Sequence, residues 1–219
     1  MTSARRPAGL AVVLATLTAV TLPSAGVLPS AEAAPAASRA AGTSARMPHC
    51  NHDQIENGAV MREVQLRDRD FRVTHSVRKR VARGTEFSRT VTMGSTDQVT
   101  ASISGTTTVK ADAGAFFAKA SAEASVTLAG NKQKTTNESL EERFTIPPKP
   151  RDRLFVFYEG VAVYAFKAHQ RVCNRGGERD YFGKLRSWEK TYESGNVLCP
   201  HSRYRTGSPK YQIALSGGC

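Results

Sequence analysis

The chain has 219 residues, with 31 Lys or Arg against 19 Asp or Glu, which gives a formal net charge of +12. A basic balance of this size favours anionic partners, such as an anionic cell surface, through non-specific attraction, and it indicates no specific nucleic-acid recognition. After residue 33 no stretch holds about eighteen uncharged apolar residues, so the sequence excludes a membrane-spanning helix from the remainder.

Residues 1–33 have the pattern of a secretory signal peptide. Arg5 and Arg6 precede a nearly continuous apolar stretch at residues 8–27, and residues 31–33 read Ala-Glu-Ala, a small-x-small cleavage site. We therefore expect a secreted, extracellular protein. The residues that follow are numerous enough for one domain with a hydrophobic core.

Residues 34–47 are predicted to be a disordered arm. They consist of Ala, Ser, Pro, Gly and Thr with two arginines, and nothing large precedes Met47. Such a segment cannot bury enough apolar surface to offset its ordering entropy. An arm of this kind serves as a spacer or is accepted by a partner as an added strand. The candidate partner-binding residues are Ala34, Pro35, Arg39 and Arg46.

The four cysteines are predicted to form two disulfides, because an even number of cysteines in an exported chain is normally oxidised. Three connectivities are possible. Pairing Cys50 with Cys173 would tie together the ends of the β-rich middle and leave Cys199 with Cys219. The histidines around Cys50 fit no common zinc spacing, so residues 48–53 are predicted to be a solvated loop and no metal or cofactor is expected.

Residues 61–92 are predicted to form β-strands with a basic outer face. Apolar residues alternate with polar ones on both sides of position 70, and His75 falls on the apolar face, where a core histidine is expected. Residues 78–80 read Arg-Lys-Arg and are predicted to be an exposed turn.

Residues 99–128 have a long alternating pattern, around which the rest of the predicted fold is organised. Alternate residues from Val99 onward are small or apolar, and after Gly114 the phase of this alternation reverses. Two amphipathic strands joined by a turn, a long hairpin, are the predicted structure. The charged residues of this stretch all fall on its polar face. The candidate membrane-inserting or interaction residues of the hairpin are Val99, Ile103, Val109, Phe116, Phe117, Val126 and Leu128.

Two other structures for this stretch stay open. Residues 111–124 are rich in alanine, the best helix former, and Lys119 and Glu123 are spaced for an ion pair on a helix. Alternatively, both strands belong to a β-sandwich with one solvated face. The internal Gly114 and the neighbouring Thr, Ser and Val favour strands.

The rest of the chain supports an all-β fold. Residues 131–142 are polar, residues 144–150 resemble a strand ended by prolines, and residues 154–166 form an apolar core strand with a bend near Gly160. We predict an elongated, twisted antiparallel sheet. Its β domain would span residues 48–173, followed by a loop-rich, disulfide-held extension at residues 174–219.

The order of these features over residues 86–168 resembles the pore-forming region of aerolysin-type toxins, including the epsilon-toxin and mosquitocidal-toxin branch. The resemblance implies an aerolysin-like domain at residues 48–173 whose tucked hairpin is released when the protein self-oligomerises on membranes. The hairpins would then form a transmembrane barrel. The chain departs from the family in its short length and in the alanine-rich apolar face of residues 99–128.

Two other function classes are open. The first is a small, non-lytic adapter subunit of a secreted antibacterial toxin complex that joins larger components through residues 34–47. The second is a secreted hydrolase or nuclease. The sequence has five histidines but no catalytic pairing or metal spacing stands out, so a non-enzymatic protein is predicted.

Overall fold

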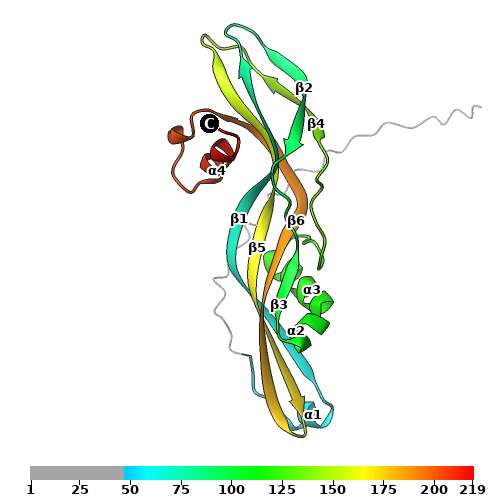
Figure 1. Cartoon of the computed structure of the whole chain (residues 1–219). Coiled ribbons are helices and arrows are strands. Elements are labelled where there is room, and N and C mark those ends of the chain that lie inside the picture. Colours follow the sequence, from blue (N-terminus) through cyan, green and yellow to red (C-terminus); the bar gives the residue numbers. More distant parts are fainter. Residues whose placement is uncertain (1–46) are drawn as a thin grey trace, which may run out of the picture. The chain divides into compact units, whose positions relative to one another are not determined.

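The computed structural model describes residues 47–219 (Figure 1). The signal peptide predicted at residues 1–33 lies outside the described residues. So do the candidate arm residues Ala34, Pro35, Arg39 and Arg46.

Six strands form a single antiparallel sheet in the order β3-β6-β5-β1-β2-β4. This confirms the predicted all-β class. The strands are β1 (Val60–Val81), β2 (Phe87–Ser95), β3 (Ser102–Gly105), β4 (Leu140–Ile146), β5 (Arg153–Asn174) and β6 (Gly177–Leu198). The helices are α1 (His52–Glu56), α2 (Thr107–Ala111), α3 (Ala113–Ala124), the 3-10 turn η1 (His201–Arg203) and α4 (Pro209–Ser216).

Three long strands, β1, β5 and β6, make the body of the sheet. Each has 22 residues, so each extends for about 70 Å. Figure 1 shows them twisting around one another. The predicted bend near Gly160 coincides with register shifts in both ladders of β5. A Cβ on Gly160 would lie 2.5 Å from the carbonyl oxygen of Arg72. The close approach of β5 to β1 at this position therefore requires glycine.

β2 and β4 form a short ribbon at one end of the sheet. They pair over seven residues each, and β2 meets β1 only at Ser95 and Gly94, opposite His75 and Ser76. A separate core fills this end. Its buried residues are Val81, Val91, Met93, Phe144, Ile146, Phe155 and Phe157.

The prediction of a loop-rich extension over residues 174–219 is wrong for its first half. Residues 177–198 form β6, which pairs with β5 along nearly its whole length, so the sheet does not end at residue 173. Within the predicted extension, the part without strands is residues 199–219. There η1 and α4 are held by the Cys199–Cys219 disulfide, and Ile213 and Ala214 pack against Val156 and Val197.

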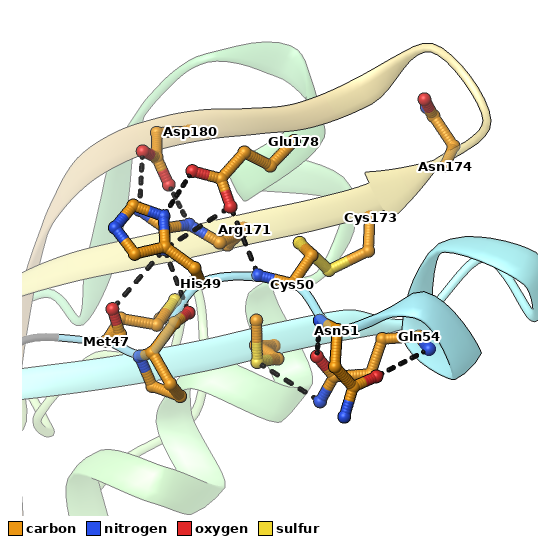
Figure 2. The surroundings of a disulfide bond; sticks show 12 residues. Met47, His49, Cys50, Asn51, Gln54, Arg171, Cys173, Asn174, Glu178 and Asp180 are labelled. Carbon is orange, nitrogen blue, oxygen red and sulfur yellow. Dashed lines mark hydrogen bonds and ion pairs between the residues drawn. A yellow bond between two sulfur atoms is a disulfide. The ribbon is translucent and has the colours of Figure 1, made fainter.

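The other disulfide, Cys50–Cys173, fastens the start of the described chain to the end of β5. Figure 2 shows its surroundings, with Arg171 between acidic side chains and the carbonyl oxygen of Met47. Residues 51–56 depart from the predicted loop, because Asn51 and Gln54 form a capping box that starts α1. Among residues 47–219 no group of His, Cys, Asp and Glu is arranged to hold a metal ion. Across the same residues, no helix has the length and apolarity needed to cross a membrane.

Candidate functional site: the insert between β2 and β4

Residues 96–139, which we call the insert, leave the sheet after β2 and return to it at β4. They contain the stretch predicted to be a long hairpin, and that prediction is wrong for this structure. Residues 102–105 form the short strand β3, and residues 107–124 form α2 and α3. Both helices lie beside the sheet and contact the central part of its long strands (Figure 1).

Local sequence explains the helices. The side chain of Thr106 caps α2 by accepting a hydrogen bond from the amide of Val109, and Ser125 ends α3 in the left-handed conformation with φ 55°. Between these caps lies the alanine-rich stretch that favours a helix. Gly114 is exposed in the first turn of α3, where the helix tolerates it.

The apolar residues of the insert are buried against the sheet. Val109 and Phe116 are fully buried and Phe117 is 6% exposed, and they share a core with Phe166 and Leu185 of β5 and β6. Val99 and Leu128 are also buried, while Ile103 and Val126 are partly buried at the margin of this core. The residues predicted to contact lipid therefore contact the protein's own sheet here.

Asp112, at the junction of α2 and α3, is the polar anchor of the insert. Its Oδ2 accepts two hydrogen bonds from Arg62 of β1, from Nε at 3.1 Å and from Nη2 at 2.7 Å. Nε2 of Gln170 on β5 donates a third, at 2.7 Å. Gln170 is 2% exposed, so this contact gives the buried amide nitrogen of Gln170 a hydrogen-bond acceptor.

Two glycines allow β3 to lie against β6. Gly105 has φ +141°, and a Cβ added to it would lie 2.6 Å from the carbonyl oxygen of Phe182. A Cβ on its register partner Gly183 would lie 2.5 Å from the carbonyl oxygen of Ser104 and 2.8 Å from Cγ1 of Val109. No other residue type would permit both approaches without displacement.

The return segment of the insert is held by hydrogen bonds to β6. The amide of Ala129 donates to the carbonyl of Trp188 at 2.8 Å, and Oγ of Ser187 donates to the carbonyl of Ala129 at 2.7 Å. Within the insert, the buried Thr135 bonds Val99 through its backbone and its hydroxyl. The two ends of the insert, near Val99 and Thr135, thus lie side by side.

His75 fixes the point where the insert rejoins β4. It is fully buried, as predicted for a core histidine, and its Nε2–H donates to the carbonyl oxygen of Glu138 at 2.7 Å. Its Nδ1 lies 3.1 Å from Oγ1 of Thr74 and 3.7 Å from a carboxylate oxygen of Glu159. Burial raises the pKa of the Glu159 carboxyl above its usual value, and the nearby His75 opposes this rise.

The register of β2 and β4 gives the insert a second possible arrangement. The last pair of this ladder is Met93 opposite Leu140. Continued residue by residue, the same register places Val109 opposite Ala124 and brings the two arms together at Phe116 and Phe117. The phase reversal in the sequence, after Gly114 and Ala115, falls next to this point, so both apolar alternations would lie on one face of such a hairpin.

Comparison of the chain with protein-family models, with curated proteins and with solved structures finds no match.

Sequence reasoning located the insert but missed the contacts that dock it. Asp112 was recognised only as a charge on the polar face, and its partners Arg62 and Gln170 lie far away in the chain. Gly105 and Gly183 carried a usable signal, since glycine within a strand often marks close backbone approach.

Proposed function

We propose that this protein is an exported, non-enzymatic, membrane-acting β-pore former. In this proposal, the insert leaves the sheet and refolds as a hairpin that continues β2 and β4. The observation that carries the proposal is that the continued register of β2 with β4 turns at Phe116 and Phe117, next to the phase reversal after Gly114 and Ala115. The resemblance to aerolysin-type toxins in the order of the segments supports the same conclusion.

The charges of the insert support this hairpin. In the continued register Lys110 would face Glu123 directly, and Asp112 would lie diagonally opposite Lys119. Opposite charges in such positions stabilise paired strands. All four lie on the polar face, which would line the water-filled interior of a barrel.

The length of the hairpin is sufficient for a bilayer. A barrel strand needs about 9–11 residues to cross the hydrocarbon core. The alternation, with its four charged residues confined to the polar face, runs through residues 99–115 on the outgoing arm and residues 118–130 on the return arm, and both exceed this requirement.

The edge of β1 offers a place for the outgoing arm. β2 pairs with β1 only at its last residues, and no other described strand lies along that edge of β1 between Val60 and Thr74. An extended continuation of β2 would run antiparallel along this edge.

The docked insert is the form expected in water. Releasing Val109, Phe116 and Phe117 from the core would expose three buried side chains and cost about 5–9 kcal/mol. An isolated hairpin would also leave its backbone groups unpaired in lipid. Conversion therefore requires both a membrane and several copies that close a ring.

A reversible disulfide staple tests the conversion. Ser104 and Lys184 are exposed register partners on β3 and β6, so the Ser104→Cys/Lys184→Cys variant would fasten the insert to the sheet. We expect the oxidised variant to release dye from phosphatidylglycerol-containing liposomes at least tenfold more slowly than wild type. Mild reduction should restore release, with wild type treated identically.

The matched control is a staple at the base of the insert. Thr92 and Glu141 are exposed partners on β2 and β4, which stay paired in both arrangements. Thr92→Cys/Glu141→Cys should lyse normally when oxidised. Equal lysis by both stapled proteins would contradict the conversion, and a wild type that releases no dye would contradict the pore.

A second disulfide reports the hairpin directly. Gly114 and Lys119 are exposed and lie five residues apart in α3, about 7.5 Å along its axis, but face each other in the continued register. Gly114→Cys/Lys119→Cys should therefore cross-link only on membranes. Ala118→Cys/Glu123→Cys has the same spacing in α3 but lies on one arm of the hairpin, so it should not cross-link in either form.

A further inference from the structure

A groove of about 810 Å³ crosses β1, β5, β6 and β3. In β5 and β6, the core residues Phe166 and Leu185 face the insert. Because side chains alternate along a strand, their neighbours Lys167, Lys184 and Arg186 lie on the opposite face. The groove therefore lies on the face of the sheet opposite the core covered by α2 and α3, and β3 of the insert contributes to its lining.

The lining combines apolar surface with positive charge. Its apolar part includes Ala165 and Phe182. Phe182 is 49% exposed, and its ring stacks on the His169 ring at a centroid distance of 4.5 Å. Lysine and arginine side chains surround this surface, and the lining contains no Asp or Glu. The four cationic residues are Arg67, Lys167, Lys184 and Arg186.

These cations are available for a ligand. Within the described part of the chain, none of their side chains has a salt bridge or hydrogen-bond partner, whereas Arg62 pairs with Asp112 and Arg171 with Asp180. Nζ of Lys167 lies 5.3 Å from the centroid of the Phe182 ring, which places positive charge next to the exposed aromatic surface.

We propose that this groove binds an amphipathic anion, with its phosphate between the cations and its hydrocarbon chain on Phe182 and Ala165. The expected natural source is an anionic phospholipid. Residues 34–46 do not have the required chemistry, because they include Arg39 and Arg46 and no acidic residue. A nucleic acid would match the charge but offers no hydrocarbon for the apolar surface.

The groove is complete only while β3 is docked, because Ser102, Ser104 and Gly105 contribute to its lining. A ligand that binds this form alone stabilises it. Its binding can be measured on the protein in solution without membranes, so the outcome does not depend on the proposed pore.

The probe is dodecyl phosphate below its micelle concentration. At a concentration about 100-fold above the dissociation constant, we expect it to raise the Tm by about 5–10 °C. Inorganic phosphate tests the charge alone, dodecyl maltoside tests the chain alone, and both should bind at least tenfold more weakly. Equal binding of either one, or no binding of dodecyl phosphate, would overturn the proposal.

Variants locate the site. Phe182→Ala and Lys184→Gln alter exposed side chains, and each should weaken dodecyl phosphate binding about tenfold while leaving the Tm of the free protein nearly unchanged. The controls Leu215→Ala and Lys190→Gln change equally exposed residues outside the groove and should have no effect. Unchanged affinity in the groove variants would overturn the assignment. So would a single-stranded oligonucleotide that binds as tightly and loses affinity in the same variants.

Discussion

Arg62 donates two hydrogen bonds to one carboxylate oxygen of Asp112, and this links β1 to the junction between α2 and α3. Gln170 of β5 donates to the same oxygen, and the helices also contact the sheet through apolar side chains of a shared core. Apolar contacts stabilise the docked helices without strong directional preference, whereas Asp112 also accepts a hydrogen bond from Nε2 of the buried Gln170. The stability of the docked insert should therefore be sensitive to this single carboxylate.

Asp112→Ala should destabilise the protein by about 1–3 kcal/mol, because it breaks the ion pair and leaves the Gln170 amide without its partner. The rate of amide hydrogen exchange should rise first in residues 107–124. If the protein forms pores, the variant should also release dye from liposomes faster than wild type. Asp68→Ala, at an exposed position on β1, the strand of Arg62, is the control. Equal effects of the two substitutions would show that Asp112 does not dock the insert.

Gly183→Ala should loosen β3 and α2 from the sheet. The added methyl would lie 2.5 Å from the carbonyl oxygen of Ser104 and 2.8 Å from Cγ1 of Val109, so β3 and α2 must shift. Overpacking of this kind costs about 1–3 kcal/mol. Limited proteolysis should show faster cleavage within residues 102–111. Gly94→Ala has open space around its methyl and should leave cleavage unchanged; the same rate in both variants would contradict the expected role of Gly183.

The class of the fold could be predicted because alternation along β1 and the apolar run of β5 determine which faces are buried. β6 was missed because its sequence is charged and glycine-containing, and its burial depends on pairing with β5. Aromatic residues such as Tyr181 and Trp188 carried a strand signal, but the charges between them resembled a loop. Only the long-range register makes this segment a strand.

The insert illustrates why local pattern did not determine local structure. Alternating alanine with Ser, Lys and Glu has a period of two, yet alanine also has the highest helix propensity. Packing on the sheet favours the helices here, because α3 can bury Phe116 and Phe117 on one side. In addition, Thr106 caps the start of α2 and Ser125 ends α3. The same alternation remains compatible with the extended form.

Asp180→Asn should lower the Tm at neutral pH. Asp180 accepts hydrogen bonds from Nε and Nη2 of Arg171 at 2.8 and 2.9 Å and from Nε2 of His169 at 2.8 Å. These bonds, those of Arg171 first, hold the pKa of the Asp180 carboxyl far below its usual 3.8. A lowered pKa in the folded protein means stability that is present above pH 3.8 and is lost as the pH falls below it.

The measurement is the Tm of wild type and Asp180→Asn from neutral pH down to pH 2. The difference between them should be largest at neutral pH and shrink below about pH 4, where the unfolded carboxyl becomes protonated. Asp68→Asn, at an exposed position, should give a small difference at every pH. A constant deficit in Asp180→Asn across this range would mean that packing, and not the carboxylate charge, accounts for its effect.

Deleting residues 34–45 should change the Tm by no more than a degree or two, because the deletion keeps the contacts that fasten the start of the described chain. Met47 is 8% exposed, and the carbonyl oxygens of Met47 and Pro48 accept hydrogen bonds from Arg171. The Cys50–Cys173 disulfide also remains. Thermal melts of the mature and truncated proteins test this expectation.

The same deletion separates the pore former from the adapter suggested by the sequence. A pore former acts through the insert, so the truncated protein should release dye from liposomes at the rate of the mature protein. An adapter would use residues 34–47 as a strand added to a partner, so truncation should abolish recovery of co-secreted proteins in a pull-down. Normal lysis with unchanged partners would favour the pore, whereas lost partners without lysis in either form would contradict it, because the function would then reside in the N-terminal segment.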